Sequence, residues 1–151
     1  MTLNEVLIRQ NFLVKILFKD GESELSKELK VKIMGLRIAL GKIRKQYDED
    51  IQEAIKGFKP DGFDELSQKE NKLEEEEEKL QIMVKSINEE YNLFIVEKNN
   101  EEVVLDKSLI FTEEEFEQIL EVNTGNDVEI NGNSLPAADF LEVIYSLFVA
   151  E

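Results

Sequence analysis

The sequence predicts a mainly α protein of the α+β class, built on a long antiparallel helical hairpin. A short N-terminal helix precedes the hairpin, and a small C-terminal cap of short strands and two helices follows it. Three observations favour this architecture: two long stretches with helical apolar spacing, a Pro/Gly turn between them, and a change to short, capped segments after the second stretch. We expect residues 1–98 to form the first helix and the hairpin, and residues 99–151 an acidic α/β cap that folds with them as one unit.

The first helix is expected to begin at a capping-box pattern, Thr2-Leu3-Asn4-Glu5. In such a box the threonine hydroxyl and the glutamate carboxylate bind backbone amides that the first helical turn leaves free. Apolar residues continue at helical spacing to Phe18, and the segment Lys19-Asp20-Gly21 supplies a glycine stop. Residues 12–18, FLVKILF, are apolar nearly throughout, so a strand is the competing interpretation of this stretch.

The first arm of the hairpin is predicted to begin near Ser23 or Ser26 and to continue to Phe58. Leucine, isoleucine and aromatic residues recur there every three or four positions, which keeps one apolar stripe on one side of a helix. The turn Lys59-Pro60-Asp61-Gly62 ends this arm. The second arm is expected to begin after Asp64, or at the box Ser67-x-x-Glu70, and to continue the same spacing.

Five consecutive glutamates stand in the second arm, within the sequence KLEEEEEKLQ. If the turn is centred near residues 60 and 61, residues 74–78 lie opposite residues 43–47, where the first arm is basic. We interpret the run as cross-helix ion pairs that set the register, each contributing about 0–1 kcal/mol. A divalent-metal site is disfavoured because adjacent carboxylates on a helix point in different directions. The residues predicted to form the register pairs are Arg44, Lys45, Glu74 and Glu77.

The cap is expected to contain two short strands and two short helices. Residues 103–105 and 128–130 have β-branched character and could pair, and Asn131-Gly132 predicts a tight turn. The box Thr112-Glu113-Glu114-Glu115 begins one helix, and Ser134-Leu135-Pro136 begins the other. No internal repeat is evident along the chain.

The segment 123–139 lies between the two predicted helices of the cap and was compared with the loop of an EF-hand. Loop positions 1, 3, 5 and 6 match Asp127, Glu129, Asn131 and Gly132. Position 12 needs a bidentate glutamate but is Ala138, and a second frame that begins at Asn123 lacks both the glycine and the glutamate. We therefore expect no bound metal and no other cofactor, and keep a degenerate calcium binder only as an alternative.

Several classes of function are disfavoured by composition. The chain has no histidine, no cysteine and no glycine-rich phosphate-binding loop, so the sequence predicts a protein that is not an enzyme. No apolar run is long enough to span a bilayer, and residues 1–20 do not resemble a signal peptide. We expect a cytoplasmic protein without a membrane partner.

Charge is distributed unevenly along the chain, whose net charge is −16. Residues 1–62 are close to neutral, whereas residues 99–151 contain one lysine and thirteen acidic residues. This acidity disfavours direct binding to nucleic acid and favours a basic protein partner. Apolar residues that lie off the hairpin seam need cover from the rest of the chain, a partner or a second copy. The residues predicted for such a partner surface are Met34, Ile38, Met83, Glu113, Glu114 and Glu117.

Three stretches together resemble a family of short, uncharacterised proteins encoded by tailed bacteriophages. They are NFLVKILFKDGESELS before a long helix, EEYNLF before EEVVLD, and the closing LPAADFLEVIYSLFVAE. The resemblance covers most of the chain and implies a protein made in the bacterial cytoplasm, but the family offers no settled activity. We therefore expect a non-enzymatic protein-binding or assembly module. The main alternative is an acidic inhibitor that mimics nucleic acid and blocks a host defence or DNA-processing protein.

Overall fold

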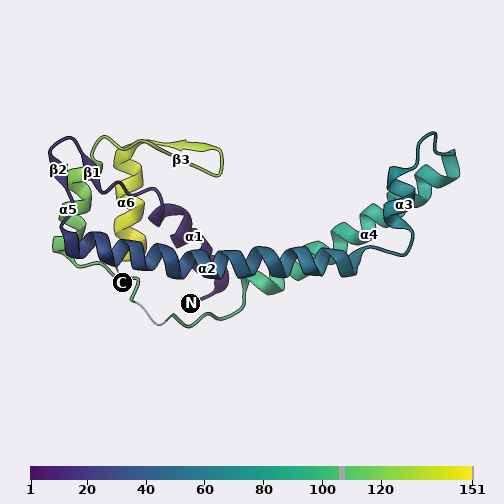
Figure 1. Ribbon diagram of the computed structural model, residues 1–151, viewed down its shortest axis with the longest axis horizontal. Helices are drawn as coiled ribbons and strands as arrows, with labels where there is room; N and C mark the ends of the chain where they lie inside the picture. Colours follow the sequence, from purple (N-terminus) through teal and green to yellow (C-terminus); the bar gives the residue numbers. More distant parts are fainter. Residues whose placement is uncertain (106–107, 151) are drawn as a thin grey trace. The chain divides into compact units, whose positions relative to one another are not determined.

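The computed structural model describes residues 1–105 and 108–150, and it confirms a mainly α fold with a small β content (Figure 1). The helices are α1 (Leu3–Leu13), α2 (Lys27–Phe58), α3 (Phe63–Gln68), α4 (Glu74–Asn99), α5 (Glu113–Asn123) and α6 (Ala137–Phe148). The strands are β1 (Lys19–Asp20), β2 (Ser23–Glu24), β3 (Val128–Ile130) and β4 (Asn133–Leu135). They form two antiparallel hairpins, β1–β2 and β3–β4.

The chain divides into two compact units. The first contains Met1–Ile43 together with Glu102–Glu151, and the second contains Arg44–Glu101. This division differs from the predicted boundary after residue 98, because the first half of α2 is buried in the same core as the C-terminal elements. Residues of the N-terminal part and of the predicted cap share one core.

The first unit contains the same order of elements twice, namely a helix, a two-stranded hairpin and a second helix. Each copy begins with a Thr-x-x-Glu capping box, at Thr2 and at Thr112, and each box is followed by an 11-residue helix. The second helix of each copy begins at Lys27 and at Ala137, so equivalent residues stay 110 positions apart up to that point. The two copies share the length of the first helix and the position of the hairpin turn but few side chains, so the repeat of elements is not evident in the sequence.

Helix α1 is shorter than predicted. Its capping box is confirmed, but the helix ends at Leu13 and residues 14–18 form a loop. The segment Lys19-Asp20-Gly21 is not a helix stop: its first two residues form β1, and Gly21, with a φ of +61°, lies in the hairpin turn. The competing strand over residues 12–18 is not formed either.

The second hairpin confirms the predicted tight turn. Ile130 pairs with Asn133, and the two residues between them, Asn131 and Gly132, have φ values of +52° and +78°. Positive φ at both positions is typical of a type I′ turn, for which Asn-Gly is the preferred sequence. The predicted pairing of residues 103–105 with 128–130 was wrong, because 128–130 pairs with the strand that directly follows this turn.

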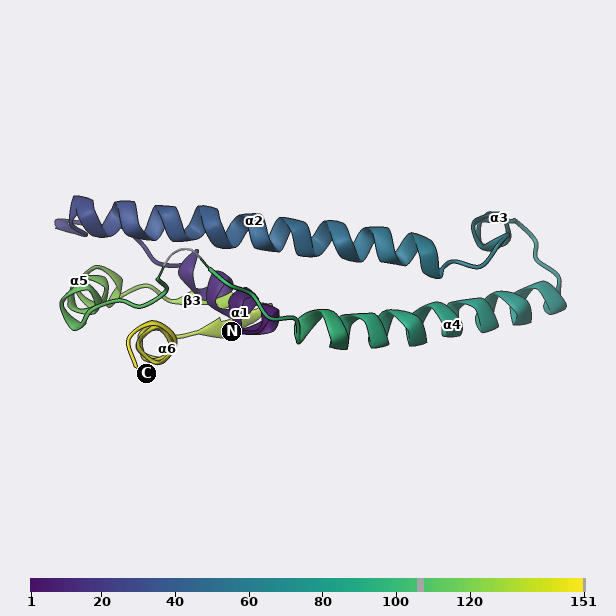
Figure 2. The same ribbon diagram turned by 90° about the horizontal axis from the view of Figure 1, so that it is seen from below.

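The core of the first unit lies where α1, α5 and α6 pack against one side of the first half of α2 (Figures 1 and 2). Two ring contacts join its layers: Phe12 stacks on Phe140 at 6.3 Å, and Phe111 lies 5.3 Å from Phe148. Helix α2 contributes one stripe of apolar residues at helical spacing to this core, as the sequence predicted. The residues of that stripe are Leu29, Ile33, Leu36 and Leu40.

In the second unit, α4 runs antiparallel to the second half of α2, which confirms the predicted hairpin (Figure 2). The Phe58 ring contacts the Phe94 ring at 5.9 Å. Nearer the start of this half of α2, the Lys98 ammonium lies 2.7 Å from the Asp50 carboxylate.

The predicted hairpin register was wrong. The chain after Gly62 first forms the six-residue helix α3, and α4 begins only at Glu74, after Asn71 adopts a φ of +52°. Because Phe58 at the end of α2 faces Phe94, the glutamate run lies beyond that end, beside α3. Glu74 and Glu77 therefore do not face Arg44 and Lys45. Within the run, Glu76 instead pairs with Lys69, which precedes the helix.

Candidate functional site

An open apolar groove lies between α5 and α6, with a volume of about 470 Å³. Its lining residues are Phe116, Leu120, Thr124, Ala138, Leu141, Glu142 and Tyr145. Two of these residues, Phe116 and Tyr145, contact each other through their rings, edge to face at 5.1 Å. Leu120 is 40% exposed and Tyr145 37% exposed, so apolar side chains line a surface that is open to solvent.

Acidic side chains border this groove. Residues 108–151 contain ten acidic residues and no lysine or arginine. Glu113 and Glu117 precede Leu120 by seven and three positions on α5, and this spacing places all three on one face of the helix. Glu114 lies on the adjoining face. Of the predicted partner residues, Glu113 contacts Tyr145 of the lining and Glu117 shares a helix face with Leu120, whereas the apolar lining was not predicted.

A hydrogen bond across the groove orients one of its aromatic walls. The Tyr145 hydroxyl on α6 donates to the Glu113 carboxylate on α5 at 2.8 Å. This bond raises the pKa of the Tyr145 hydroxyl, because the neighbouring carboxylate disfavours a phenolate. The tyrosine therefore stays protonated at neutral pH and links the two helices.

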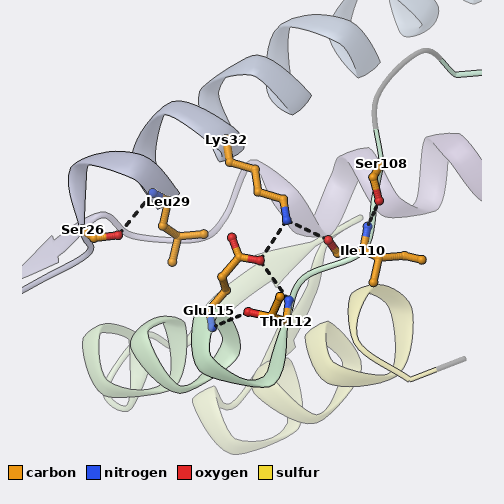
Figure 3. A network of polar contacts seen from close by, with 7 residues as sticks. All are labelled: Ser26, Leu29, Lys32, Ser108, Ile110, Thr112 and Glu115. Carbon is orange, nitrogen blue, oxygen red and sulfur yellow. Dashed lines mark hydrogen bonds and ion pairs between the residues drawn. The ribbon is translucent and has the colours of Figure 1, made fainter.

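Lys32 of α2 fixes the start of α5 (Figure 3). Its ammonium donates to the Glu115 carboxylate and to the Ile110 carbonyl, both at 2.8 Å. The same Glu115 oxygen accepts from the Thr112 amide at 2.9 Å, so the carboxylate that completes the capping box also binds a lysine from another helix. The sequence predicted this capping box, but it did not predict that Lys32 would pair with Glu115.

The Glu115 carboxyl is partly buried, and burial alone would raise its pKa. The hydrogen bonds from Lys32 and Thr112 outweigh burial and hold the pKa below its ordinary value. A carboxyl whose pKa is lower in the folded state stabilises the fold above its unfolded pKa of about 4.3, and this stabilisation is lost as pH falls through the folded pKa.

We expect Glu115→Gln to lower the free energy of unfolding by about 1–2 kcal/mol at pH 7, through loss of the charged partner of Lys32. The difference from the wild type should shrink as pH falls below about 4.3, because the wild-type carboxyl then becomes neutral as well. Urea unfolding measured between pH 7 and pH 3 checks this. Glu117→Gln, which makes the same charge change at an exposed position, is the control and should show no comparable pH-dependent difference. A Glu115→Gln difference that stays constant with pH would contradict the assignment.

Asn123, the last residue of α5, joins the end of that helix to the loop after α1. It is completely buried, and its side-chain oxygen accepts from the Leu17 amide at 2.8 Å. Its side-chain amide donates to the carbonyls of Leu17 at 3.2 Å and Ile119 at 2.8 Å. Asn126 adds a parallel bond to the Lys15 carbonyl at 2.9 Å. These amides hold the N-terminal loop against the base of α5.

In residues 123–139, the segment compared with an EF-hand loop, the polar side chains have structural roles. Asp127 accepts a hydrogen bond from the Ala137 amide at 2.8 Å, so its carboxylate caps the start of α6. Asn131 and Gly132 form the hairpin turn, and Asn123 points into the core. Within residues 1–105 and 108–150, no three acidic side chains converge as a metal site requires.

The apolar residues predicted for a partner surface lie at two places. Met34 and Ile38 are exposed on α2, on the side opposite its buried stripe. Met83 is half-buried on α4 and lines a shallow pocket with Leu66 of α3. Met34 and Ile38 thus lie in the first unit and Met83 in the second, and none of the three lines the groove between α5 and α6.

Comparison with known proteins finds no family model that matches the sequence, and no curated protein or solved structure that is significantly similar to it. Among the described residues, no helix is both long enough and apolar enough to cross a membrane. The geometry of the groove therefore carries the functional argument alone.

Proposed function

We propose that the protein is a non-enzymatic protein-binding or assembly module whose groove between α5 and α6 takes a basic, amphipathic helix of a partner. One observation carries this proposal: an open apolar groove lies within a segment that has ten acidic residues and no basic one. Apolar side chains of the partner would enter the groove, and its lysines or arginines would meet the acidic border.

The dimensions of the groove favour a helix of the partner. Helices α5 and α6 have 11 and 12 residues, so the groove walls are about 16–18 Å long, or about three helical turns. A helix laid along them could insert apolar residues spaced three and four positions apart between Phe116, Leu120 and Tyr145. The acidic border would favour partners with basic flanks and speed their association at low salt.

A fluorescently labelled, designed 16-residue helical peptide tests this proposal, with leucines along one face and lysines on both flanks. We expect micromolar binding by fluorescence anisotropy and at least tenfold weaker binding to Leu120→Glu, because the substitution places a carboxylate in the apolar groove. Leu93→Glu on α4, an exposed leucine outside the groove, is the matched control and should bind as the wild type does. The same peptide with glutamates for lysines should not bind. Equal binding to Leu120→Glu and wild type would contradict the proposal.

A second candidate is an acidic inhibitor that mimics nucleic acid, which the absence of basic residues from 108–151 favours. Such a mimic would displace DNA from a DNA-processing enzyme, would lose affinity steeply with salt, and would tolerate Leu120→Glu. A partner helix held in the groove would tolerate salt better but not the substitution. The resemblance to phage-encoded proteins would place either activity in the cytoplasm of an infected bacterium.

A further inference from the structure

A row of side chains on the outer face of α2, which we call the outer row, is a candidate ligand for the groove. Three exposed apolar residues, Val31, Met34 and Ile38, are 62%, 50% and 60% exposed. Lys27 precedes them by one turn and Lys42 follows them by one turn. The spacing of four, three, four and four residues keeps all five side chains on one face of the helix. The outer row is therefore apolar in the middle and basic at both ends.

The outer row lies opposite the stripe that α2 buries. Leu29, Ile33, Leu36 and Leu40 face the core, so α2 carries an apolar face on each of two sides. A helix that is exposed on one side normally carries polar residues there.

The outer row fits the groove in length and in charge. From Lys27 to Lys42 it extends about 22 Å, compared with about 16–18 Å for the groove walls, so lysines at its two ends would lie at the groove's borders. Those borders carry Glu113, Glu117 and Glu142. The outer row therefore has the apolar centre and basic flanks that the proposed function requires of a partner helix.

We infer that the groove takes the outer row of α2 from a second copy of this chain. This inference rests on the proposed function and names the partner for the same groove. Charge favours this arrangement over a symmetric contact between two outer rows. An antiparallel pair of rows would bring Lys27 against Lys42, and a parallel pair would align identical lysines, so both would place like charges together. The groove of a second copy offers carboxylates instead.

This contact is heterologous, because each copy presents its outer row to one neighbour and its groove to another. Heterologous contacts produce closed rings where the rotation between copies closes, and open filaments where it does not. The association should weaken as salt is raised, since charged flanks contribute to it. The average mass in solution should also rise above the monomer mass of 17.5 kDa as the protein concentration increases.

Two full-length variants test the inference by complementation. Met34→Glu disables the outer row and leaves the groove intact, whereas Leu120→Glu disables the groove and leaves the outer row intact. Both residues are exposed, so circular dichroism should show folds unchanged from the wild type. We expect sedimentation velocity to show concentration-dependent association of the wild type, monomers for each variant alone, and a heterodimer of twice the monomer mass when the two variants are mixed in equal amounts.

Each other outcome would contradict the inference. A monomeric wild type at millimolar concentration would exclude self-association, and the designed peptide could still bind the groove, so the proposed function would stand. Dimers of Leu120→Glu alone would indicate a contact between two outer rows. A mixture that stays monomeric, after a wild type that associates, would show that copies meet through another surface. The mixture of Met34→Glu with Leu93→Glu is the matched control. Leu93→Glu keeps both surfaces and should associate with itself. Met34→Glu keeps only its groove, so each of its molecules should bind one outer row of Leu93→Glu and add no further copy.

Discussion

Replacing Asn123 with alanine is expected to lower the free energy of unfolding by about 2–4 kcal/mol, a large effect for one polar side chain. The side chain is fully buried, and it bonds both the amide and the carbonyl of Leu17 as well as the Ile119 carbonyl. Alanine would leave the Leu17 groups without these partners and would open a small cavity at the base of α5. Buried polar groups that lose their partners cost about 1–3 kcal/mol, and the cavity adds to that cost.

Urea unfolding followed by circular dichroism measures this effect. Asn133→Ala, on an exposed position of β4, is the control and should change stability by less than about 0.5 kcal/mol. Asn123→Asp separates hydrogen bonding from volume, since it keeps the acceptor but replaces the amide donor with a carboxylate that faces two carbonyls. We expect Asn123→Asp to destabilise at least as much as alanine at pH 7. Wild-type stability of both Asn123 variants would show that the loop after α1 does not depend on this side chain.

The sequence predicted those elements whose cause is local. Both Thr-x-x-Glu boxes begin helices where expected, at Thr2 and at Thr112, because the box satisfies backbone amides within four residues of chain. Asn131-Gly132 formed the expected turn because its positive φ values suit only a few residue types. The buried stripe of α2 follows from its spacing alone.

Elements set by contacts distant in sequence were missed. The loop after α1 is held by Asn123, which is more than one hundred residues away in the sequence. Helix α1 therefore ends at Leu13, although the apolar spacing predicted a helix to Phe18. The predicted hairpin register was wrong because α3 and the break at Asn71 lengthen the connection between α2 and α4. A register counted from an assumed turn centre shifts with every residue added to that connection. Neither cause leaves a strong local pattern.

The candidate site was predicted in part. Its acidity follows from composition, and Glu113, Glu114 and Glu117 were predicted for that reason. The apolar lining was missed because no face was assigned to the short helix that contains Phe116 and Leu120. The sequence did contain an indication of this lining. The apolar stripes of α5 and α6 are wider than one buried face requires, because they also include Leu120, Leu141 and Tyr145. The same signal marks the outer row of α2.

Ile33 and Met34 are adjacent on α2, and we expect opposite results from replacing each with alanine. Ile33 is fully buried among the core residues of the first unit, so Ile33→Ala should lower the free energy of unfolding by about 2–4 kcal/mol through lost burial and a new cavity. Met34 is 50% exposed on the outer row, so Met34→Ala should change the stability of the monomer by less than about 0.5 kcal/mol.

Self-association should respond in the reverse order. At a protein concentration where the wild type associates, Met34→Ala should weaken the association because it removes the centre of the outer row, whereas Ile33→Ala should leave it unchanged as long as the protein stays folded. Urea unfolding at low concentration and sedimentation velocity at high concentration measure the two effects separately. Equal loss of stability in both variants would mean that Met34 is covered within the monomer. The outer row would then belong to the core of a single chain, and neither face of α2 would be free to meet a groove.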